Sequence, residues 1–92
     1  MPFDSIHNYY EPLVNEAITR SMENGEFLDS DALEDVACVA LNQLPARYVR
    51  HTVDMVYYMT IEEREKIKKE VAQAVKGAFA LVKSHLHSHQ NT

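Results

Sequence analysis

The side chains best suited to bind a ligand stand together in one short segment, residues 47–51. A guanidinium group matches a phosphate or the O6/N7 edge of guanine, and a tyrosine ring offers a face on which a base can stack. In the alternative interpretation, the tyrosine packs and the arginines pair with surplus acids such as Glu34 or Asp54. The segment is our first candidate for an anion or nucleotide site. Its charged and aromatic members are Arg47, Tyr48, Arg50 and His51.

Three further polar residues, Asn8, Glu11 and Asn42, are embedded in apolar helical stretches. They could hydrogen-bond a ligand or lock two helices together. A structural role is also open for two of them. Asn42 could cap a helix before Pro45, and Glu11 would favour the N-terminus of a helix that opens at Pro12.

The sequence offers no catalytic motif: it shows no nucleophile–base pair, no phosphate-binding glycine loop and no carboxylate pair with a visible task. We therefore expect no enzyme. The single cysteine, Cys38, stands in an apolar helical run, where a buried small hydrophobe is the expected role. His85 and His89 have the i, i+4 spacing of metal ligands, with His87 between them, but a solvated, frayed tail over about residues 86–92 is the better interpretation. We expect no metal and no cofactor.

Length and charge narrow the class of protein. Ninety-two residues make one domain, spanning 1–92, and 46% hydrophobic content excludes a disordered chain. A net charge of −5 argues against direct nucleic-acid binding, because phosphate neutralisation needs a basic face. No signal peptide precedes the first helix and no apolar run is long enough to span a bilayer, so we expect a cytoplasmic protein without membrane contact.

The apolar periodicity predicts helices on both sides of a short connection. A first helix is expected over about Asp4 to Met22, capped by Asp4 or Ser5; alternatively, the regular helix begins near Pro12 or kinks there. Asn24-Gly25 should end it. A second helix is expected over about Ala32 to Gln43. Its side chains are apolar nearly all round, and Asp31 and Glu34 form its capping box.

The remaining chain predicts a small all-α domain of four segments. Residues 47–58 have β propensity and could form a short extended segment after Pro45 or a third helix from about Thr52. Thr60 and Glu63 form a clean capping box for a final helix from about Ile61 to the region of residues 84–87. The cluster at residues 57–59 is expected to pack in the core. The apolar stripe of the final helix consists of Ile67, Val71, Ala74, Val75, Ala78, Phe79, Val82 and Leu86.

Two strings resemble the late-competence ComFB family. The first is Asn8-Tyr9-Tyr10-Glu11-Pro12-Leu13-Val14, and the second runs from Glu34 to Tyr48 and contains Ala40-Leu41-Asn42-Gln43-Leu44-Pro45-Ala46-Arg47-Tyr48. They follow the pattern N-x-x-E-P-L-V, a spacer, then D-[VI]-x-A-x-A-L-N-x-L-P-x-R-Y, over about the first half of the chain. Many relatives have a second proline where this chain has Ala46. The pattern maps onto Asn8, Glu11, Pro12, Asp35, Asn42, Leu44, Pro45, Arg47 and Tyr48.

The resemblance implies a dimeric, all-helical sensor of a cyclic dinucleotide, with cyclic di-GMP the expected ligand. Some members of the family carry cysteines just before the second helix, but this chain reads Asp29-Ser30-Asp31-Ala32 there, so zinc does not carry over. The competing hypothesis is a protein-interaction module of the competence or type IV pilus DNA-uptake machinery that binds no nucleotide. In either case we expect a homodimer and an unidentified signalling or pilus partner, because a short chain with an apolar central helix leaves surface to cover.

Overall fold

The fold was obtained as a computed structural model that describes residues 5–90, except for the side chains of residues 52, 54, 56 and 87–90. This part of the chain is mostly helical, as the sequence predicts, with one small antiparallel ribbon in addition. The elements are β1 (His7–Asn8), α1 (Tyr10–Glu23), α2 (Ser30–Gln43), β2 (Tyr48–Val49), α3 (Thr52–Tyr58) and α4 (Ile61–Gln90).

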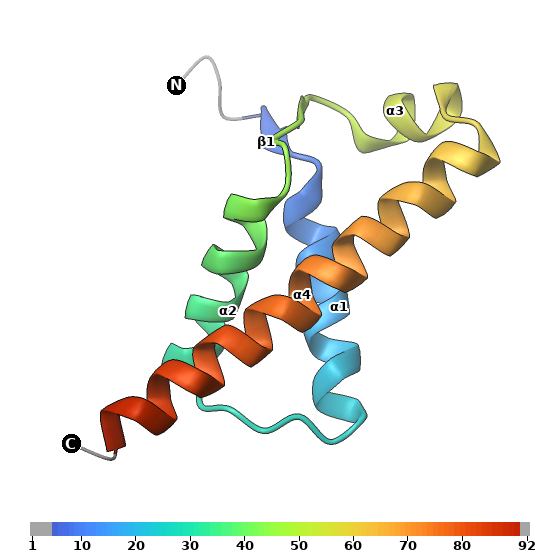
Figure 1. The fold of residues 1–92 in the computed structure, drawn as a ribbon. Helices are drawn as coiled ribbons and strands as arrows, with labels where there is room; N and C mark the ends of the chain where they lie inside the picture. The colour runs from blue at the N-terminus through green and yellow to red at the C-terminus, as the bar shows by residue number, and fades with distance from the viewer. Residues whose placement is uncertain (1–4, 91–92) are drawn as a thin grey trace.

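Three of the helices form the body of the molecule. The long helix α4 crosses both α1 and α2, and these two also pack against each other (Figure 1). The β1–β2 ribbon lies where the N-terminal end of α1 and the C-terminal end of α2 meet. Helix α3 follows the ribbon and has no comparable packing against the other helices.

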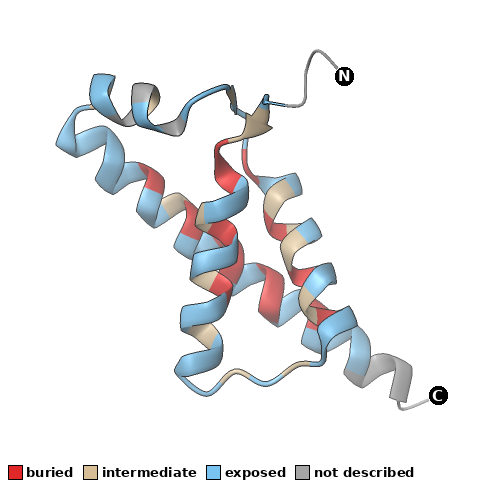
Figure 2. Ribbon diagram, turned by 180° about the vertical axis from the view of Figure 1, so that it is seen from behind, coloured by how far each residue is buried: buried red, intermediate tan, exposed pale blue. Residues whose placement is uncertain are grey.

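The core lies where α1, α2 and α4 face one another (Figure 2). The stripe predicted on α4 is confirmed from Ile67 to Val82, since every member in that range is buried. Leu86, the last predicted member, is 36% exposed. The largest fully buried side chains are Val14, Val36 and Val75, one from each of the three helices.

The expected burial of Cys38 is wrong, because its side chain is exposed. The buried residues of α2 are Ala32, Val36 and Ala40, which recur every four positions and so share one face. Cys38 lies two positions from Val36, and a rotation of about 100° per residue places it on the opposite side of the helix. Helix α2 therefore has a buried face and an open face, and it is not covered all round.

Helix α1 starts later than about Asp4, because residues 7–8 pair as a strand instead. Asp4 lies outside the described residues, and Ser5 lies in a turn ahead of the strand. The alternative in which the regular helix opens close to Pro12 is confirmed: Pro12 occupies the first turn, where its missing N–H has no intrahelical partner to lose.

The cap of α2 is Asp29 and not Asp31. The Asp29 carboxylate accepts a hydrogen bond from the amide of Ala32 at 2.8 Å. The backbone of Asp29 is extended, as an N-cap requires. Asp31 falls inside the first turn, where it faces the positive end of the helix dipole. At the other end, Leu44 adopts φ −98° and ψ 140°. This is the extended conformation imposed on a residue before proline.

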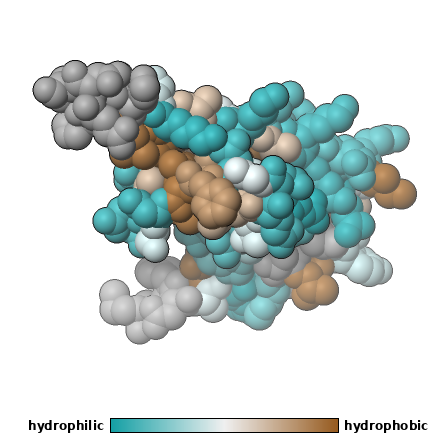
Figure 3. Space-filling view, turned by 90° about the horizontal axis from the view of Figure 1, so that it is seen from below, coloured by the Kyte–Doolittle hydropathy of each residue, from teal (hydrophilic) through white to brown (hydrophobic). Residues whose placement is uncertain are grey.

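The connection between α1 and α2 is tied back to α4. Gly25 supplies the left-handed turn predicted for the end of α1, with φ at 107°. Glycine adopts this conformation without steric cost, because it has no Cβ. The carboxylate of Glu26 forms an ion pair with Lys83, whose ammonium lies 6.0 Å from the centroid of the Phe79 ring. Phe27, in the same connection, remains 85% exposed. Apolar side chains gather between hydrophilic ones at this end of the molecule (Figure 3).

Both interpretations of residues 47–58 are realised in succession, as a two-residue strand and then a seven-residue helix. The predicted start of the final helix is confirmed: the hydroxyl of Thr60 accepts from the amide of Glu63 at 3.0 Å. Helix α4 continues to Gln90, beyond its expected end near residues 84–87. Residues 91–92 of the expected tail lie outside the described residues.

Candidate functional site

The β1–β2 ribbon holds the basic segment, residues 47–51, at one end of the molecule. In the antiparallel register, His7 is opposite Val49 and Asn8 is opposite Tyr48. The amide of Tyr9 extends the pairing by donating to the carbonyl of Arg47 at 2.7 Å. The segment that the sequence singled out is thus fixed directly onto the start of α1.

Asn8 joins the two chain segments through a single side-chain oxygen. Its Oδ1 accepts from the amide of Tyr10 at 3.2 Å. This bond satisfies a donor in the first turn of α1 that has no partner within the helix. The same atom accepts from the amide of Arg47 at 3.1 Å, across 39 positions in the chain. The side chain of Asn8 therefore ties the start of α1 to the basic segment, and it does not lock two helices together.

The chemically active side chains of the basic segment point into solvent. Arg47, Arg50 and His51 are exposed, and Tyr48 is 69% exposed, so the interpretation in which this tyrosine packs is wrong. Arg50 Nε lies 3.2 Å from Nε2 of His51. It donates to that nitrogen when the nitrogen is unprotonated. The pairing with Glu34 considered above is not formed, and the side chain of Asp54 lies outside the described part of α3.

A hollow of about 380 Å³ opens beside the basic segment. It is lined by Val49, Arg50 and His51 from the segment and by Met55 and Tyr58 from α3. The hollow is shallow and wide open to solvent, unlike the concave ligand pockets that usually enclose about 300–1,000 Å³. It combines a cation, an imidazole and an aromatic ring.

Tyr58 and Met55 were missed by the sequence reasoning, which expected residues 57–59 to pack in the core. Tyr57 and Tyr58 are 81% and 82% exposed and form an edge-to-face pair with their ring centroids 5.3 Å apart. Only Met59 packs against the core. The physical reason is that α3 is too short and too far from the body to bury both rings. The one available signal was the cap at Thr60, which separates this segment from the long helix.

Glu11 and Asn42 lie at the same end of the molecule as the basic segment, but among the described side chains they form no hydrogen bond or ion pair with it. Glu11 is exposed in the first turn of α1, and Asn42 is exposed near the end of α2. Within the described part of the chain, neither side chain forms a hydrogen bond or an ion pair. The position of Glu11 fits its structural alternative, stabilisation of a helix N-terminus.

The charge of Arg47 in the basic segment influences the pKa of a buried residue, Tyr10, which is 4% exposed. Burial raises the pKa of the Tyr10 phenol above its ordinary value, and the negative charge of Glu70 on α4 raises it further. The positive charge of Arg47 acts in the opposite direction and lowers this pKa. Arg47 is therefore close enough to the core to affect it, although its side chain is exposed.

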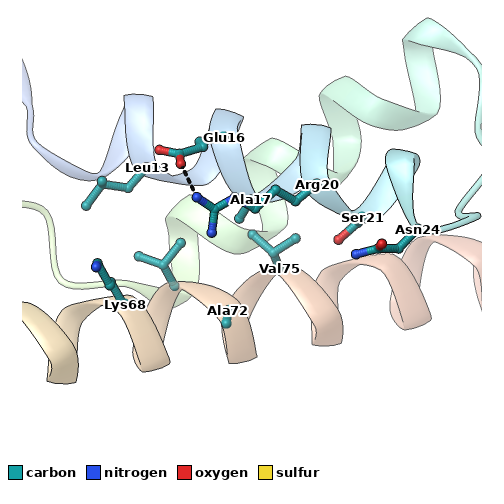
Figure 4. Close-up of a pocket in the computed structure, with 10 residues that line it drawn as sticks. Leu13, Glu16, Ala17, Arg20, Ser21, Asn24, Lys68, Ala72 and Val75 are labelled. Atoms are coloured by element: carbon teal, nitrogen blue, oxygen red, sulfur yellow. Dashed lines mark hydrogen bonds and ion pairs between the residues drawn. The ribbon is translucent and has the colours of Figure 1, made fainter.

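A second hollow, of about 280 Å³, runs between α1 and α4 and contains none of the predicted site residues (Figure 4). Its floor is apolar and includes Val71 and Val75. At its rim, Arg20 is paired with Glu16 at 2.6 Å, so this guanidinium already has a carboxylate partner. The basic segment, in contrast, carries two arginines without a carboxylate partner among the described side chains.

Over the described residues, no helix is long and apolar enough to cross a membrane. The same part of the chain contains no group of three histidine, cysteine, aspartate or glutamate side chains placed to hold a metal ion. The histidine pair His85 and His89 lies only partly within the described residues, because the side chains of His87 and His89 are not described.

Fold and site together define a small helical domain that presents a basic and aromatic surface segment on a short ribbon. The family model for the late competence development protein ComFB matches residues 7–86. The chain belongs to the ComFB family, and the match extends well beyond the first half in which the two strings lie. Membership suggests a role related to competence. No curated protein and no solved structure gives a significant match.

Proposed function

We propose that this protein is a cytosolic receptor for a cyclic dinucleotide second messenger, with cyclic di-GMP the expected ligand. The observation that carries the proposal is the exposed basic segment, held in place by the ribbon and bordered by the hollow against α3. The family membership supports a competence-related role. The cyclic dinucleotide is the ligand that the family resemblance implies, and the chemistry of the segment suits it.

The charges of the segment suit such a ligand. A cyclic dinucleotide carries two phosphates, and an acidic protein must gather local positive charge to accept them. Arg47 and Arg50 provide two guanidinium groups three positions apart. They are exposed and form no ion pair with a described carboxylate, so no such pair has to break before they bind a phosphate.

The rings of the segment suit the bases. Tyr48 is exposed on the ribbon, and Tyr58 lines the hollow beside Arg50. Stacking of a base on an aromatic side chain contributes about 1–3 kcal/mol per base. A purine dinucleotide would therefore gain from two rings on neighbouring elements as well as from the arginines.

Calorimetric titration with cyclic di-GMP, cyclic di-AMP and GTP tests the proposal. We expect saturable binding of cyclic di-GMP, weaker binding of cyclic di-AMP and none of GTP at the same concentrations. Lys68→Ala is the matched control, because Lys68 is an exposed cation on α4 outside the site. If no cyclic dinucleotide binds, the receptor proposal is wrong.

The second candidate function is a protein-interaction module of the competence or type IV pilus DNA-uptake machinery that binds no nucleotide. It is favoured by the exposed apolar side chains of α3, which nothing in the described chain covers. Under both functions we propose a homodimer. Negative titrations together with capture of a pilus or competence component by the intact protein would favour this second candidate.

A further inference from the structure

The connection between α1 and α2 carries the most exposed large hydrophobic side chain of the described chain, Phe27, which is 85% exposed. Met22 near the end of α1 and Leu86 near the end of α4 are each 36% exposed. Leu86 follows Lys83 by one helical turn, and Lys83 pairs with Glu26, the neighbour of Phe27. We call Met22, Phe27 and Leu86 the connection surface. It belongs to the end of the molecule seen in Figure 3, where apolar side chains gather between hydrophilic ones.

Phe27 is held outward by its two neighbours in the chain. The carboxylate of Glu26 pairs with Lys83, and the side chain of Leu28 is partly buried and packs against the core. The turn before them is also fixed, because the amide of Glu26 donates to the carbonyl of Ser21 at 3.0 Å. An aromatic ring that is already held in place loses little conformational freedom on binding, so Phe27 is suited to anchor a partner.

The acidic charge of the protein is concentrated around this surface. Residues 23–35 contain six of the 14 acidic side chains and no lysine or arginine. The remainder of the chain has eight acids and nine bases, so it is nearly neutral. The six acids are Glu23, Glu26, Asp29, Asp31, Glu34 and Asp35.

Three of these acids have a structural task. Asp29 caps α2, Asp31 faces the positive end of the dipole of that helix, and Glu26 pairs with a lysine of α4. Glu23 is unfavourable where it stands, because a negative charge at the C-terminal end of a helix opposes the helix dipole. The acids that are exposed and form no hydrogen bond or ion pair with a described side chain are Glu23, Glu34 and Asp35.

The basic side chains near this end of the molecule do not neutralise those three carboxylates. Arg20 and Lys83 each pair with a glutamate outside this group of three. Lys76 lines a hollow between the end of α1 and α4, and His85 also lies on α4. Within the described residues, Lys76 is the one lysine or arginine beside the connection without a carboxylate partner, so the local charge remains negative.

An exposed apolar anchor among unpaired acids restricts the class of partner. Nucleic acids and anionic membranes carry the same sign of charge and are repelled. A second copy that presents the same surface would place acids against acids. Within the described residues, no three carboxylate, imidazole or thiol groups are placed to hold a metal ion. The complementary partner is a protein segment that has both basic and apolar side chains.

We propose that the connection surface docks a basic amphipathic segment of a partner protein. Phe27 inserts among the apolar side chains of that segment, and the carboxylates of Glu23 and Glu34 face its lysines or arginines. The connection lies at the opposite end of the molecule from the β1–β2 ribbon (Figure 1). The inference therefore goes beyond the receptor proposal and does not depend on the nucleotide.

A synthetic peptide provides a defined probe of this surface. The probe is a helical peptide of about 16 residues, with leucines at i, i+3 and i+4 spacing, lysines elsewhere and one terminal tryptophan. The protein contains no tryptophan, so the anisotropy of tryptophan fluorescence reports on the peptide alone. We expect saturable binding that weakens as salt is raised. A glutamate version of the peptide should not bind, and a shuffled version without an apolar face should bind at least tenfold more weakly.

Variants of the full chain locate the binding site. Phe27→Ser should raise the peptide dissociation constant by about tenfold or more. Tyr57→Ser is the matched control, because Tyr57 is an 81% exposed aromatic residue on α3, and it should bind as the wild type does. The circular dichroism spectrum should be the same for both variants, since neither ring is buried.

A second pair of variants tests the charges. Glu23→Gln combined with Glu34→Gln should raise the dissociation constant by about threefold or more and reduce its dependence on salt. Glu62→Gln combined with Glu63→Gln makes the same change in net charge at the start of α4, where both acids are exposed. This control should leave the affinity unchanged.

Several results would overturn the proposal. They are no binding of the lysine peptide to the wild type, equal binding of the glutamate or shuffled peptide, and an affinity that Phe27→Ser leaves unchanged. Sedimentation of the protein alone covers the remaining occupant: a dimer that Phe27→Ser dissociates would assign the surface to a second copy instead. These measurements contain no nucleotide, and Phe27→Ser should bind cyclic di-GMP as the wild type does. Failure of this proposal is therefore distinguishable from failure of the receptor proposal.

Discussion

The two arginines of the basic segment are the residues on which the proposed function depends most directly. Arg47→Ala and Arg50→Ala each remove a charge-assisted contact to a phosphate or guanine edge. A loss of about 1.5–3 kcal/mol, or about one to two decades in affinity, is expected for each. Calorimetry measures the affinity, and circular dichroism should still show a folded helical protein because both side chains are exposed.

Two further variants sharpen the interpretation of these affinities. Arg50→Lys keeps the charge but loses the planar fork, so a loss close to that of Arg50→Ala would indicate paired hydrogen bonds. Tyr58→Ala should also weaken binding if the hollow accepts a base. Wild-type affinity in both alanine variants of the arginines would place the ligand elsewhere.

The buried phenol of Tyr10 makes stability depend on pH in the alkaline range. The unfolded pKa is close to the ordinary value of 10.0, and the folded pKa is higher. Between these two values the unfolded state has already released the proton that the folded state keeps. The contribution of Tyr10 to the free energy of unfolding is therefore fully present below the unfolded pKa. It is lost as pH rises through the folded pKa.

Chemical denaturation between pH 8 and pH 11 can isolate this effect. The free energy of unfolding of the wild type should fall more steeply above pH 10 than that of Tyr10→Phe, which keeps the packed ring and has no proton to lose. The other tyrosines are common to both proteins and cancel in the difference. Parallel curves would show that the Tyr10 phenol titrates alike in both states.

For individual residues, the sequence indicated which residue types form the candidate site but not where the structure places them. The exposure of Arg47 and Arg50 follows from their residue type, because arginines rarely bury. Tyr58 was assigned to the core because an aromatic residue beside Met59 usually packs there. Cys38 was also assigned to the core, since composition alone does not tell which face of an apolar helix is covered.

Among the helices, α2 allows the most direct test of how its N-terminus is capped. Two aspartates near its start, Asp29 and Asp31, are candidates for the N-cap. Asp29→Ala removes the observed hydrogen bond to the Ala32 amide. Loss of such a cap should cost about 0.5–2 kcal/mol of stability. Asp31→Ala removes only a charge near the helix N-terminus, worth about 0.3–1 kcal/mol. Urea unfolding of both variants compares them directly. A greater loss for Asp31→Ala would favour the cap predicted from the sequence.

Helices with strong periodicity were predicted well, and short elements were not. The α4 stripe and the Thr60 cap follow from local chemistry, which a single sequence contains. The β1–β2 ribbon depends on a contact between His7–Asn8 and Tyr48–Val49, far apart in the chain. No local propensity encodes such a pairing, so a helix from Asp4 was the natural but wrong expectation.

For the whole molecule, the composition of the chain predicts a fold that needs no metal. The only thiol is Cys38, and a tetrahedral structural zinc site takes several cysteine or histidine ligands. Treatment with EDTA should leave the melting temperature unchanged. A fall of several degrees, reversed by added Zn²⁺, would contradict this and would direct attention to His85 and His89.

The link made by Asn8 has a consequence for the order in which the molecule forms and opens. It closes a chain loop of 39 positions. Closing a loop of this length costs on the order of 3 kcal/mol in entropy, and the two-residue strands repay it with few hydrogen bonds. The ribbon should therefore assemble after the three-helix body. It should also be the first part to separate, because it contributes little to the core.

Amide hydrogen exchange would make this visible. The amides of Tyr9 and Arg47 are bonded within the ribbon and its extension. They should exchange through a local opening, well before the amides of Val36 and Val75 in the core helices. The segment that carries the arginines would then separate from α1 and reclose many times for each global unfolding. A ligand that holds it closed should slow exchange at these two amides first.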